Sequence, residues 1–442
     1  MTFKILPTKT TLPFLLVFFF QSIQAQVLTL EQAIKQGVDN NRQLKISGYK
    51  VAHAETKYKE AVDLTLPSLK ASAGYTRLSD VEQSKIQFPG APEPVSLFPV
   101  YINNYAGKVS LSETVFSGFR LKYAMESQKL LQQATKLDAG KDRDEVVFNI
   151  INAYFNLYKL QQSIQIVNES LRSLDQRISE AQKMEQQGIL LHNDVLKLQL
   201  QRSNTELIRI DLQNNLAIAS FNFNILIGNN EKTSVNIDFT IVKDVETIKS
   251  MDEYMSDAIK NRSDLLAMTT RSRSIDNNLK NAKNSYYPQL AVAANYYDAR
   301  PNPRVIPPKD KFVTTWDAGL VLTWDLMNLY SNKHNIADSR IQLQQSEENI
   351  HLMEDGIKME VNRDYLTCNQ SKQKIEVMQS SLAQAEENYR IVNSRFHSSL
   401  ALTSELVDAD AALLQSKVNL TLAKADACVN YYRLKKATGN LN

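Results

Sequence analysis

The chain of 442 residues has few of the residue types that build compact metal and cofactor sites. It contains 12 glycines, 12 prolines, five histidines and two cysteines. Two cysteines are too few for a disulfide framework or a four-cysteine zinc site, and neither a His-Glu-x-x-His nor a Cys-x-x-Cys motif occurs. The scarcity of glycine also argues against a glycine-rich nucleotide fold. We therefore expect neither a metal ion nor a cofactor.

The charge is close to balanced, with 51 Lys and Arg against 48 Asp and Glu. A protein that holds nucleic acid through bulk charge needs a marked basic excess, so we expect no nucleic-acid partner. No combination of nucleophile and base, phosphate-binding loop or metal motif supports an enzyme. The chain is thus expected not to be an enzyme.

The first 25 residues have the pattern of a secretory signal. Lys4 and Lys9 precede an apolar run from Leu12 to Phe20, and a short polar stretch then ends at Ala25. The apolar run of about nine residues is shorter than the about 20 needed to span a bilayer, which argues against a membrane anchor. We expect residues 1–25 to be removed, which implies export, and no cysteine follows for lipid attachment.

Prolines gather in two places. One cluster lies within residues 89–99 and another within 301–308, whereas residues 100–287 and 309–442 contain none. Because proline breaks helix interiors, the two proline-free intervals can form long helices. Pro67 and Pro288 stand alone, each just before an alternating segment.

The sequence is internally duplicated. Leu66-Pro67-Ser68-Leu69 resembles Tyr287-Pro288-Gln289-Leu290, and farther along Gly188 aligns with Ser399 and Gly228 with Gly439. We expect a first structural repeat over 26–228, a linker over 229–250 and a second repeat over 251–442. Each repeat is expected to contain a helix, two strands and a long helical hairpin.

Apolar residues recur at alternating spacings of three and four in both proline-free intervals, as in a coiled coil. The stripes are Ile150, Ala153, Leu157, Leu160, Ile164, Val167, Leu171, Leu174, Ile178 and Ala181 in the first repeat, and Ile375, Met378, Leu382, Ala385, Tyr389, Val392 and Phe396 in the second. Each stripe ends at a short break, which places hairpin tips near 188 and 399. A first arm of about 70 residues would be ~105 Å long. If only the stripes are considered, a generic coiled-coil rod is the alternative explanation.

Period-two alternation beside the proline clusters predicts strands at about 68–78, 103–113, 289–299 and 312–324. Strands of this length can cross a membrane. Trp316 and Trp324 share a strand face, ~26 Å apart, as in an aromatic girdle at the two edges of an apolar band; two core tryptophans of a soluble sandwich are the alternative. Since four strands cannot close a membrane barrel, several chains must share one.

This pattern resembles the outer-membrane efflux protein family, the TolC-like channels. The resemblance rests on the duplicated helix–strand–strand–helix order and on short motifs. The motifs are Pro67, Pro288, Val115-Phe116-Ser117-Gly118, and Gly188-Ile189-Leu190 followed by Asp194-Val195. It implies a homotrimer with a twelve-stranded β-barrel, four strands per chain, above a long α-helical barrel in the periplasm. It further implies an outer-membrane exit duct that works with a periplasmic adaptor and an inner-membrane pump of the RND or ABC type. A periplasmic coiled-coil adaptor or scaffold is the alternative, although it should lack the two matched strand pairs.

The resemblance also suggests roles for residues at the hairpin tips. Asp194, Glu405 and Asp408 match acidic positions that line the closed end of the channel, and three copies of each would form rings that attract cations. The alternative is that these acids are solvated helix-start residues beside a helix N-terminus. Family members commonly have an aromatic hydroxyl and a basic residue where this chain has Phe396 and Ala401, so a polar lock of that form is not expected.

The turns themselves are candidates for docking of the adaptor. These residues are Gly188, Ile189, Leu190, Ser399, Leu400 and Ala401. Their small or apolar side chains would allow another helical hairpin to approach closely. The alternative is that Gly188 and Ser399 only make the turn.

The two cysteines, Cys368 and Cys428, are each 30 residues from position 398 and so are expected at a similar height on antiparallel helices. An exported protein can form a disulfide. Similar height alone does not bring two Cα atoms within the about 7 Å that a bond requires. We expect two buried free thiols.

Overall fold

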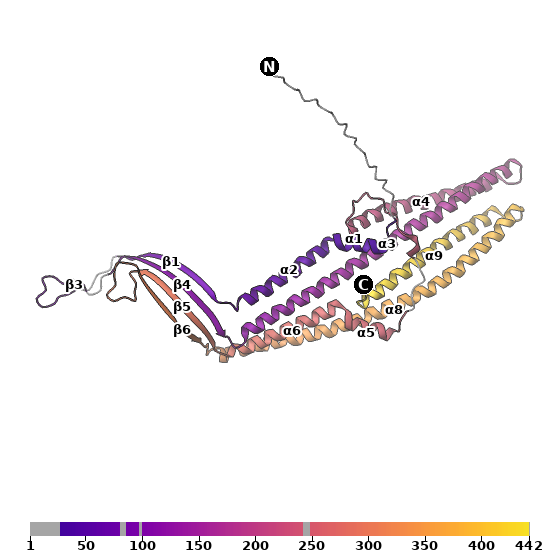
Figure 1. Cartoon of the computed structure of the whole chain (residues 1–442). Helices are drawn as coiled ribbons and strands as arrows, with labels where there is room; N and C mark the ends of the chain where they lie inside the picture. Colours follow the sequence, from indigo (N-terminus) through magenta and orange to yellow (C-terminus); the bar gives the residue numbers. More distant parts are fainter. Residues whose placement is uncertain (1–26, 80–84, 97–99, 242–247, 442) are drawn as a thin grey trace, which may run out of the picture.

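The computed structural model describes residues 27–79, 85–96, 100–241 and 248–441. It is an elongated array of long helices with a curved β-sheet at one end (Figure 1). The predicted signal at 1–25 lies outside the described residues, as do residues 242–247 of the predicted linker. Within the described residues, no helix is both long and apolar enough to cross a membrane.

The helices occur in the same order in the two halves of the chain. In the first half they are α1 (Leu30–Asn40), α2 (Arg42–Asp63), α3 (Arg120–Gln186) and α4 (His192–Ile227). In the second half they are α5 (Met251–Asn261), α6 (Ser263–Lys283), α8 (Lys333–His397) and α9 (Thr403–Ala437), with a short α7 (Asn328–Ser331) before α8. The 67 residues of α3 span about 100 Å. The predicted long arms are therefore present, except that the second one is interrupted between α7 and α8.

Four strands form one antiparallel sheet in the order β1-β4-β5-β6. They are β1 (Ser68–Arg77), β4 (Asn103–Phe116), β5 (Gln289–Arg300) and β6 (Val313–Thr323). The predicted end of the second strand at 113 is too early, because β4 continues to pair with β5 through a register shift between Thr114 and Phe116. A two-stranded ribbon, β2 (Lys85–Ile86) with β3 (Val95–Ser96), was not predicted.

Alternation separates the two faces of the sheet. Leu69 pairs with Leu111 and Tyr75 with Tyr105, so residues of like character face one another across β1 and β4. The apolar face carries Leu69, Ala71, Ala73, Tyr75, Tyr105, Val109, Leu111, Leu290, Val292, Ala294, Tyr296, Trp316, Ala318, Leu320 and Leu322, together with the polar Glu113, Asp298 and Thr314. The opposite face carries Lys70, Ser72, Thr76, Asn104, Lys108, Ser110, Ser112, Asn295, Tyr297, Thr315 and Asp317, together with the apolar Ala106, Ala291, Ala293, Ala299 and Val321. One face is thus largely apolar and the other largely polar.

The largest core lies midway along the helices, where α1, α3 and α4 meet. Tyr154 of α3 is fully buried there, and its hydroxyl donates to the carbonyl of Leu28 at 2.8 Å and accepts from the amide of Asp238 at 3.0 Å. Burial raises the pKa of Tyr154 to about 12. This one hydroxyl therefore joins the segment before α1 to the segment after α4.

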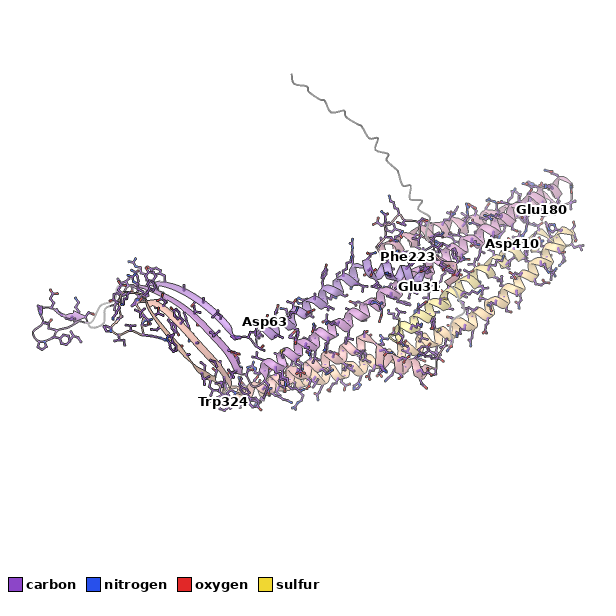
Figure 2. All side chains as sticks on the ribbon, viewed as in Figure 1. Glu31, Asp63, Glu180, Phe223, Trp324 and Asp410 are labelled. Atoms are coloured by element: carbon purple, nitrogen blue, oxygen red, sulfur yellow. The ribbon has the colours of Figure 1, made fainter. Side chains whose placement is uncertain are left out.

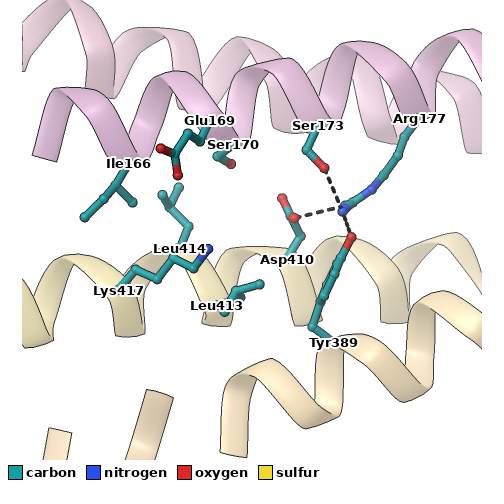
Figure 3. A pocket seen from close by; sticks show the side chains of 10 residues that line it. All are labelled: Ile166, Glu169, Ser170, Ser173, Arg177, Tyr389, Asp410, Leu413, Leu414 and Lys417. Atoms are coloured by element: carbon teal, nitrogen blue, oxygen red, sulfur yellow. Dashed lines mark hydrogen bonds and ion pairs between the residues drawn. The ribbon is translucent and has the colours of Figure 1, made fainter. Parts of the chain in front are cut away.

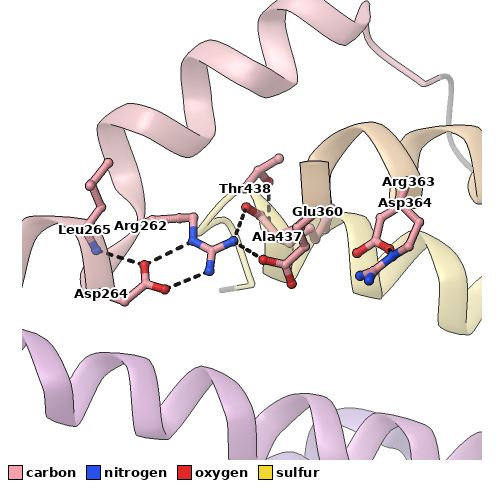
Figure 4. Close-up of polar contacts among 9 residues, drawn as sticks. Arg262, Asp264, Leu265, Glu360, Arg363, Asp364, Ala437 and Thr438 are labelled. Carbon is pink, nitrogen blue, oxygen red and sulfur yellow. Dashed lines mark hydrogen bonds and ion pairs between the residues drawn. The ribbon is translucent and has the colours of Figure 1, made fainter. Parts of the chain in front are cut away.

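In the second half of the chain, Arg262, the residue between α5 and α6, joins the start of α6 to α8 and to the end of α9 (Figure 4). Its guanidinium donates to both carboxylate oxygens of Asp264, to Glu360 of α8 at 2.5 Å and to the carbonyl of Ala437 at 3.3 Å. Burial would raise the pKa of Asp264, but the hydrogen bonds from Arg262 outweigh it and lower the pKa. The stabilisation from this pair is therefore complete at neutral pH and is lost as the pH falls through the acid range.

The two hairpin turns have the same backbone geometry. Gly188 and Ser399 adopt left-handed conformations, with φ of 73° and 57°. The following amides, of Ile189 and Leu400, donate at 2.8 Å to carbonyls five residues earlier, which closes the helix end in the same way at both turns. Ser399 thus adopts a left-handed conformation that glycine usually occupies.

The cysteines are free and buried, as expected. Cys428 lies in the main core, whereas Cys368 packs in a separate cluster with Tyr254, Ile357 and Val361. Burial raises the pKa of Cys428 to about 11 and also raises the pKa of Cys368. Both thiols are therefore shielded and overwhelmingly protonated at neutral pH.

A maleimide should consequently label neither cysteine of the folded protein within minutes at pH 7.5, because it needs an accessible thiolate. After denaturation without reductant, it should label two thiols per chain, as counted by intact mass. Absence of labelling in the denatured, unreduced protein would instead establish a disulfide.

The hairpin tips as the candidate functional site

Both hairpin tips lie at the end of the molecule opposite the sheet (Figure 1). Figure 2 shows Trp324 where the sheet meets the helices, whereas Glu180 and Asp410 lie toward the tips. The candidate tip residues and the candidate membrane girdle are therefore at separate ends of the helices.

The three candidate acids occupy the first two turns of α4 and α9. Asp194 is in the first turn of α4, and its carboxylate is 3.3 Å from the ammonium group of Lys197. Glu405 is in the first turn of α9, with Arg395 at 3.9 Å. Asp408 is exposed and has no ion pair among the described residues. Asp408 is consequently the least compensated negative charge of the three.

The six candidate docking residues do not form one surface. Ile189 and Leu400 are exposed, at 53% and 69%. Leu190 instead packs inward against the small apolar clusters of both hairpins, and Ala401 packs against the cluster that contains Phe396. Gly188 and Ser399 form the turns. Of these six residues, only Ile189 and Leu400 therefore have exposed apolar side chains.

Two further exposed leucines lie beside them. Leu191 and Leu402, each immediately before the second helix of its hairpin, are exposed at 74% and 67%. They occupy matching places in the two halves, as Ile189 and Leu400 do. These two residues were not predicted, although the duplication aligns them.

The two hairpins of the chain are joined near the tips by a buried polar cluster, which we call the clasp: Arg177 of α3, Tyr389 of α8 and Asp410 of α9 (Figure 3). Arg177 donates to Asp410 at 2.9 Å and also donates to the hydroxyl of Tyr389. Its guanidinium carbon lies 4.7 Å from the centre of the Tyr389 ring, within range of a cation–π contact. Arg177 and Asp410 are only 7% and 6% exposed.

The clasp borders a cavity of about 170 Å³. The second oxygen of Asp410, Oδ2, and the hydroxyl of Ser170 are buried there without a hydrogen-bond partner among the described residues. The clasp was not predicted, although the sequence has one signal for it, a single carboxylate within the apolar run 409–414.

The candidate girdle residues are exposed, Trp316 at 74% and Trp324 at 51%. Trp316 lies on the apolar face of β6 opposite Tyr296, whereas Trp324 follows the last residue of that strand. The indole of Trp324 donates to the carbonyl of Tyr286 at 3.1 Å. Within the described residues, no group of three or more His, Cys, Asp and Glu side chains could hold a metal ion.

The model of the outer membrane efflux protein family matches residues 33–229 and 254–440, which is most of the chain. The chain belongs to this family. As an outer membrane efflux protein, it is located in the outer membrane, and its long helices form the periplasmic extension. The fold expected from the sequence is confirmed, with long helices and four barrel strands per chain.

Solved structures share the fold of this efflux protein. It is similar to the outer membrane protein VceC from Vibrio cholerae, with 14% identity, coverage of 93% of this chain and 97% of that one, and a TM-score of 0.77. It is also similar to the CmeC outer membrane channel of Campylobacter jejuni, with 15% identity, coverage of 93% and 86%, and a TM-score of 0.74. The MtrE outer membrane channel of Neisseria gonorrhoeae gives 14% identity, 93% and 89% coverage, and a TM-score of 0.73. No curated protein sequence matches the chain.

The clasp of this efflux protein should contribute to its free energy of unfolding in a way that substitutions can test. Asp410→Leu should lower the free energy of unfolding by about 3 kcal/mol or more, because it leaves the buried Arg177 cation without its counter-charge. The double variant Arg177→Met with Asp410→Leu should recover most of the loss, since it removes both charges. Denaturant unfolding followed by helical circular dichroism measures both.

Asp408→Leu is the matched control, because it removes an exposed carboxylate two residues away on the same helix. It should change the free energy of unfolding by less than about 0.5 kcal/mol. Equal effects at 408 and 410 would contradict a buried, paired role for Asp410.

Proposed function

We propose that three copies of this chain form the exit duct of a tripartite efflux or type I secretion system. A periplasmic adaptor and an inner-membrane pump open the duct, which itself is passive. The observation that carries this proposal is a sheet with an apolar face and two unpaired edges. CmeC and MtrE, which share the fold of this chain, are outer membrane channels, in agreement with this proposal.

The sheet is incomplete in a single chain. Among the described residues, neither the outer edge of β1 nor that of β6 pairs with another strand. Unpaired backbone groups are not tolerated in hydrocarbon, so both edges need partners inside a membrane. All neighbouring strands are antiparallel, so β6 of one copy runs antiparallel to β1 of the next. Three copies would close a barrel of twelve strands, an even number as such barrels require.

The faces of the sheet support the same arrangement. Trp316, Leu320 and Leu322 are more than half exposed on the apolar face. An apolar face toward lipid and a polar face toward a water-filled lumen is the arrangement of membrane barrels. A soluble adaptor or scaffold would leave these large apolar side chains in water, so the sheet argues against that alternative.

The helices also need neighbouring copies. Both α4 and α8 carry exposed apolar side chains along their length. On α4 these are Leu196, Leu200, Leu207, Ile208, Ile210, Ile218, Phe221 and Ile225. On α8 they are Ile341, Leu352, Met359, Leu366, Val377 and Ile391. Stripes of this length would be covered if adjacent copies pack side by side into a closed wall of helices.

We further propose that the tip acids make the periplasmic entrance prefer cations. Replacing all three, as Asp194→Asn, Glu405→Gln and Asp408→Asn, should lower the cation-to-anion permeability ratio in planar bilayers, because three copies remove nine carboxylates from the narrow end. Asp408→Asn alone should have a larger effect than Asp194→Asn alone, since Lys197 already compensates Asp194.

Reversal potentials in a salt gradient measure this ratio, and the charge-retaining Asp408→Glu is the control. Native mass of the detergent-solubilised protein should show a trimer for every variant. A monomer would refute the duct, whereas unchanged selectivity of trimeric channels would refute only the acid ring.

For docking, we propose that the exposed apolar side chains of the tips contact the adaptor. Leu400→Glu should abolish export while leaving trimers in the outer membrane, because it places a charge in an apolar contact. Ser398→Glu, at an exposed neighbouring position, adds the same charge without removing an apolar side chain and should retain most export.

Export can be scored as resistance of a complemented deletion strain to a panel of toxic compounds. Leu400 suits this test better than Leu190, whose inward packing would confuse loss of docking with loss of folding. Normal resistance with Leu400→Glu would contradict the docking role.

A further inference from the structure

A basic cluster lies on the polar face of the sheet, at the opposite end of the molecule from the tip acids. Lys108 of β4 is directly opposite Tyr297 of β5, and the ammonium group of Lys108 is 5.3 Å from the centre of the Tyr297 ring. Arg304, from the loop between β5 and β6, reaches the same ring at 4.1 Å. Two cations therefore converge on one aromatic side chain.

The loop that carries Arg304 is anchored to the polar face. Asn302, only 1% exposed, donates to the carbonyl of Val313 at 2.7 Å and to the hydroxyl of Thr315 at 3.2 Å. The side-chain oxygen of Asn302 accepts from the amide of Arg304 at 2.9 Å. Because Thr315 belongs to the polar face, these bonds turn the loop toward the side that faces the lumen in the proposed barrel.

The charges of the cluster do not cancel. Arg304 donates to Asp317 at 2.5 Å, and Asp317 also accepts from Asn295 at 2.7 Å. Lys108 has no ion pair among the described residues. The cluster of Lys108, Arg304 and Asp317 thus has one uncompensated positive charge per chain, on Lys108.

The space in front of Lys108 is open. The residue paired with it on β1 is Ser72, and Gly74 follows on the same face. Lys108, Tyr297 and Arg304 border a cavity of about 420 Å³ that Ser72 and Gly74 help to line. A carboxylate or phosphate group can therefore approach the ammonium of Lys108 without displacing a bulky side chain.

We propose that Lys108, supported by Arg304, forms an anion-binding ring in the outer part of the barrel lumen, which takes the carboxylate or phosphate groups of exported solutes. The inference rests on the proposed trimeric duct, which brings three copies of the cluster around one lumen. Rings of Lys and Arg favour anions in pores, as rings of acids favour cations. The duct then has opposite charge preferences at its two ends.

The test uses the full-length trimer in planar bilayers of zwitterionic phosphatidylcholine. Inorganic tripolyphosphate is added on the side of the bilayer where the loop between β5 and β6 lies, opposite the helices. The neutral lipid leaves tripolyphosphate as the only multivalent anion present. Tripolyphosphate should block wild-type channels. Lys108→Gln should raise the blocking concentration at least about tenfold and lower the anion permeability, as expected for the loss of a charge-assisted contact.

Matched variants separate charge from shape. Lys108→Arg should retain the block. Lys85→Gln, which removes the same charge from the β2–β3 ribbon, should leave it unchanged. Asp317→Asn should strengthen the block, because it removes the carboxylate that compensates Arg304; a gain of this kind cannot result from misfolding.

The outcomes distinguish this inference from the proposed function. If trimeric channels conduct but tripolyphosphate blocks wild type and Lys108→Gln equally, or blocks neither, the anion ring is wrong and the duct stands. If no trimer or conductance is found, the duct is wrong and the ring falls with it.

Discussion

The backbone along the free edges of β1 and β6 is the constraint on which the rest of this structure depends. A four-stranded sheet in a membrane needs hydrogen-bond partners at both edges, and this chain provides none among its described residues. In the proposed duct, closure comes from other copies of the chain. Once copies are arranged around an axis at the sheet, the helices that continue from the strands are arranged around the same axis. The exposed apolar stripes on α4 and α8 then have neighbours to pack against.

The two halves of the chain form equivalent helix junctions and hairpin turns with different side chains. Asn41 caps α2 by accepting from the amides of Gln43 and Leu44, whereas the corresponding junction before α6 uses Arg262 and its ion pairs. One hairpin turn has Gly188 and the other has Ser399, with the same hydrogen bonds. Duplication has thus kept the backbone while the chemistry diverged, which is why two halves of one chain can carry different contacts at equivalent heights.

Much of the fold could be predicted because its signals are local. The period-two segments beside Pro67 and Pro288 identify the strands. The spacing of three and four identifies the long arms, and alignment of Gly188 with Ser399 identifies both turns. Each of these signals requires only residues within about ten positions of one another, or a comparison of the chain with itself.

The candidate site was predicted less completely because its contacts are distant in sequence. Arg177 and Asp410 are separated by 233 positions, and their meeting depends on how far each helix is rotated and how the two hairpins align along their length. A heptad stripe does not specify either quantity. The division between exposed Ile189 and inward Leu190 has the same origin, since it is set by packing of one hairpin tip against the other.

The clasp also shows how hairpins can be aligned without being held permanently together. A buried ion pair contributes little net free energy, because the attraction between its charges is offset by the water that both lose. While the hairpins are in contact, only one alignment places Arg177 against both Tyr389 and Asp410, so other alignments leave a buried cation unpaired. When the hairpins separate, water returns to both charges and offsets the lost attraction. The clasp therefore penalises misalignment of the packed hairpins much more than it penalises their separation, which suits the reversible opening that we propose for the duct.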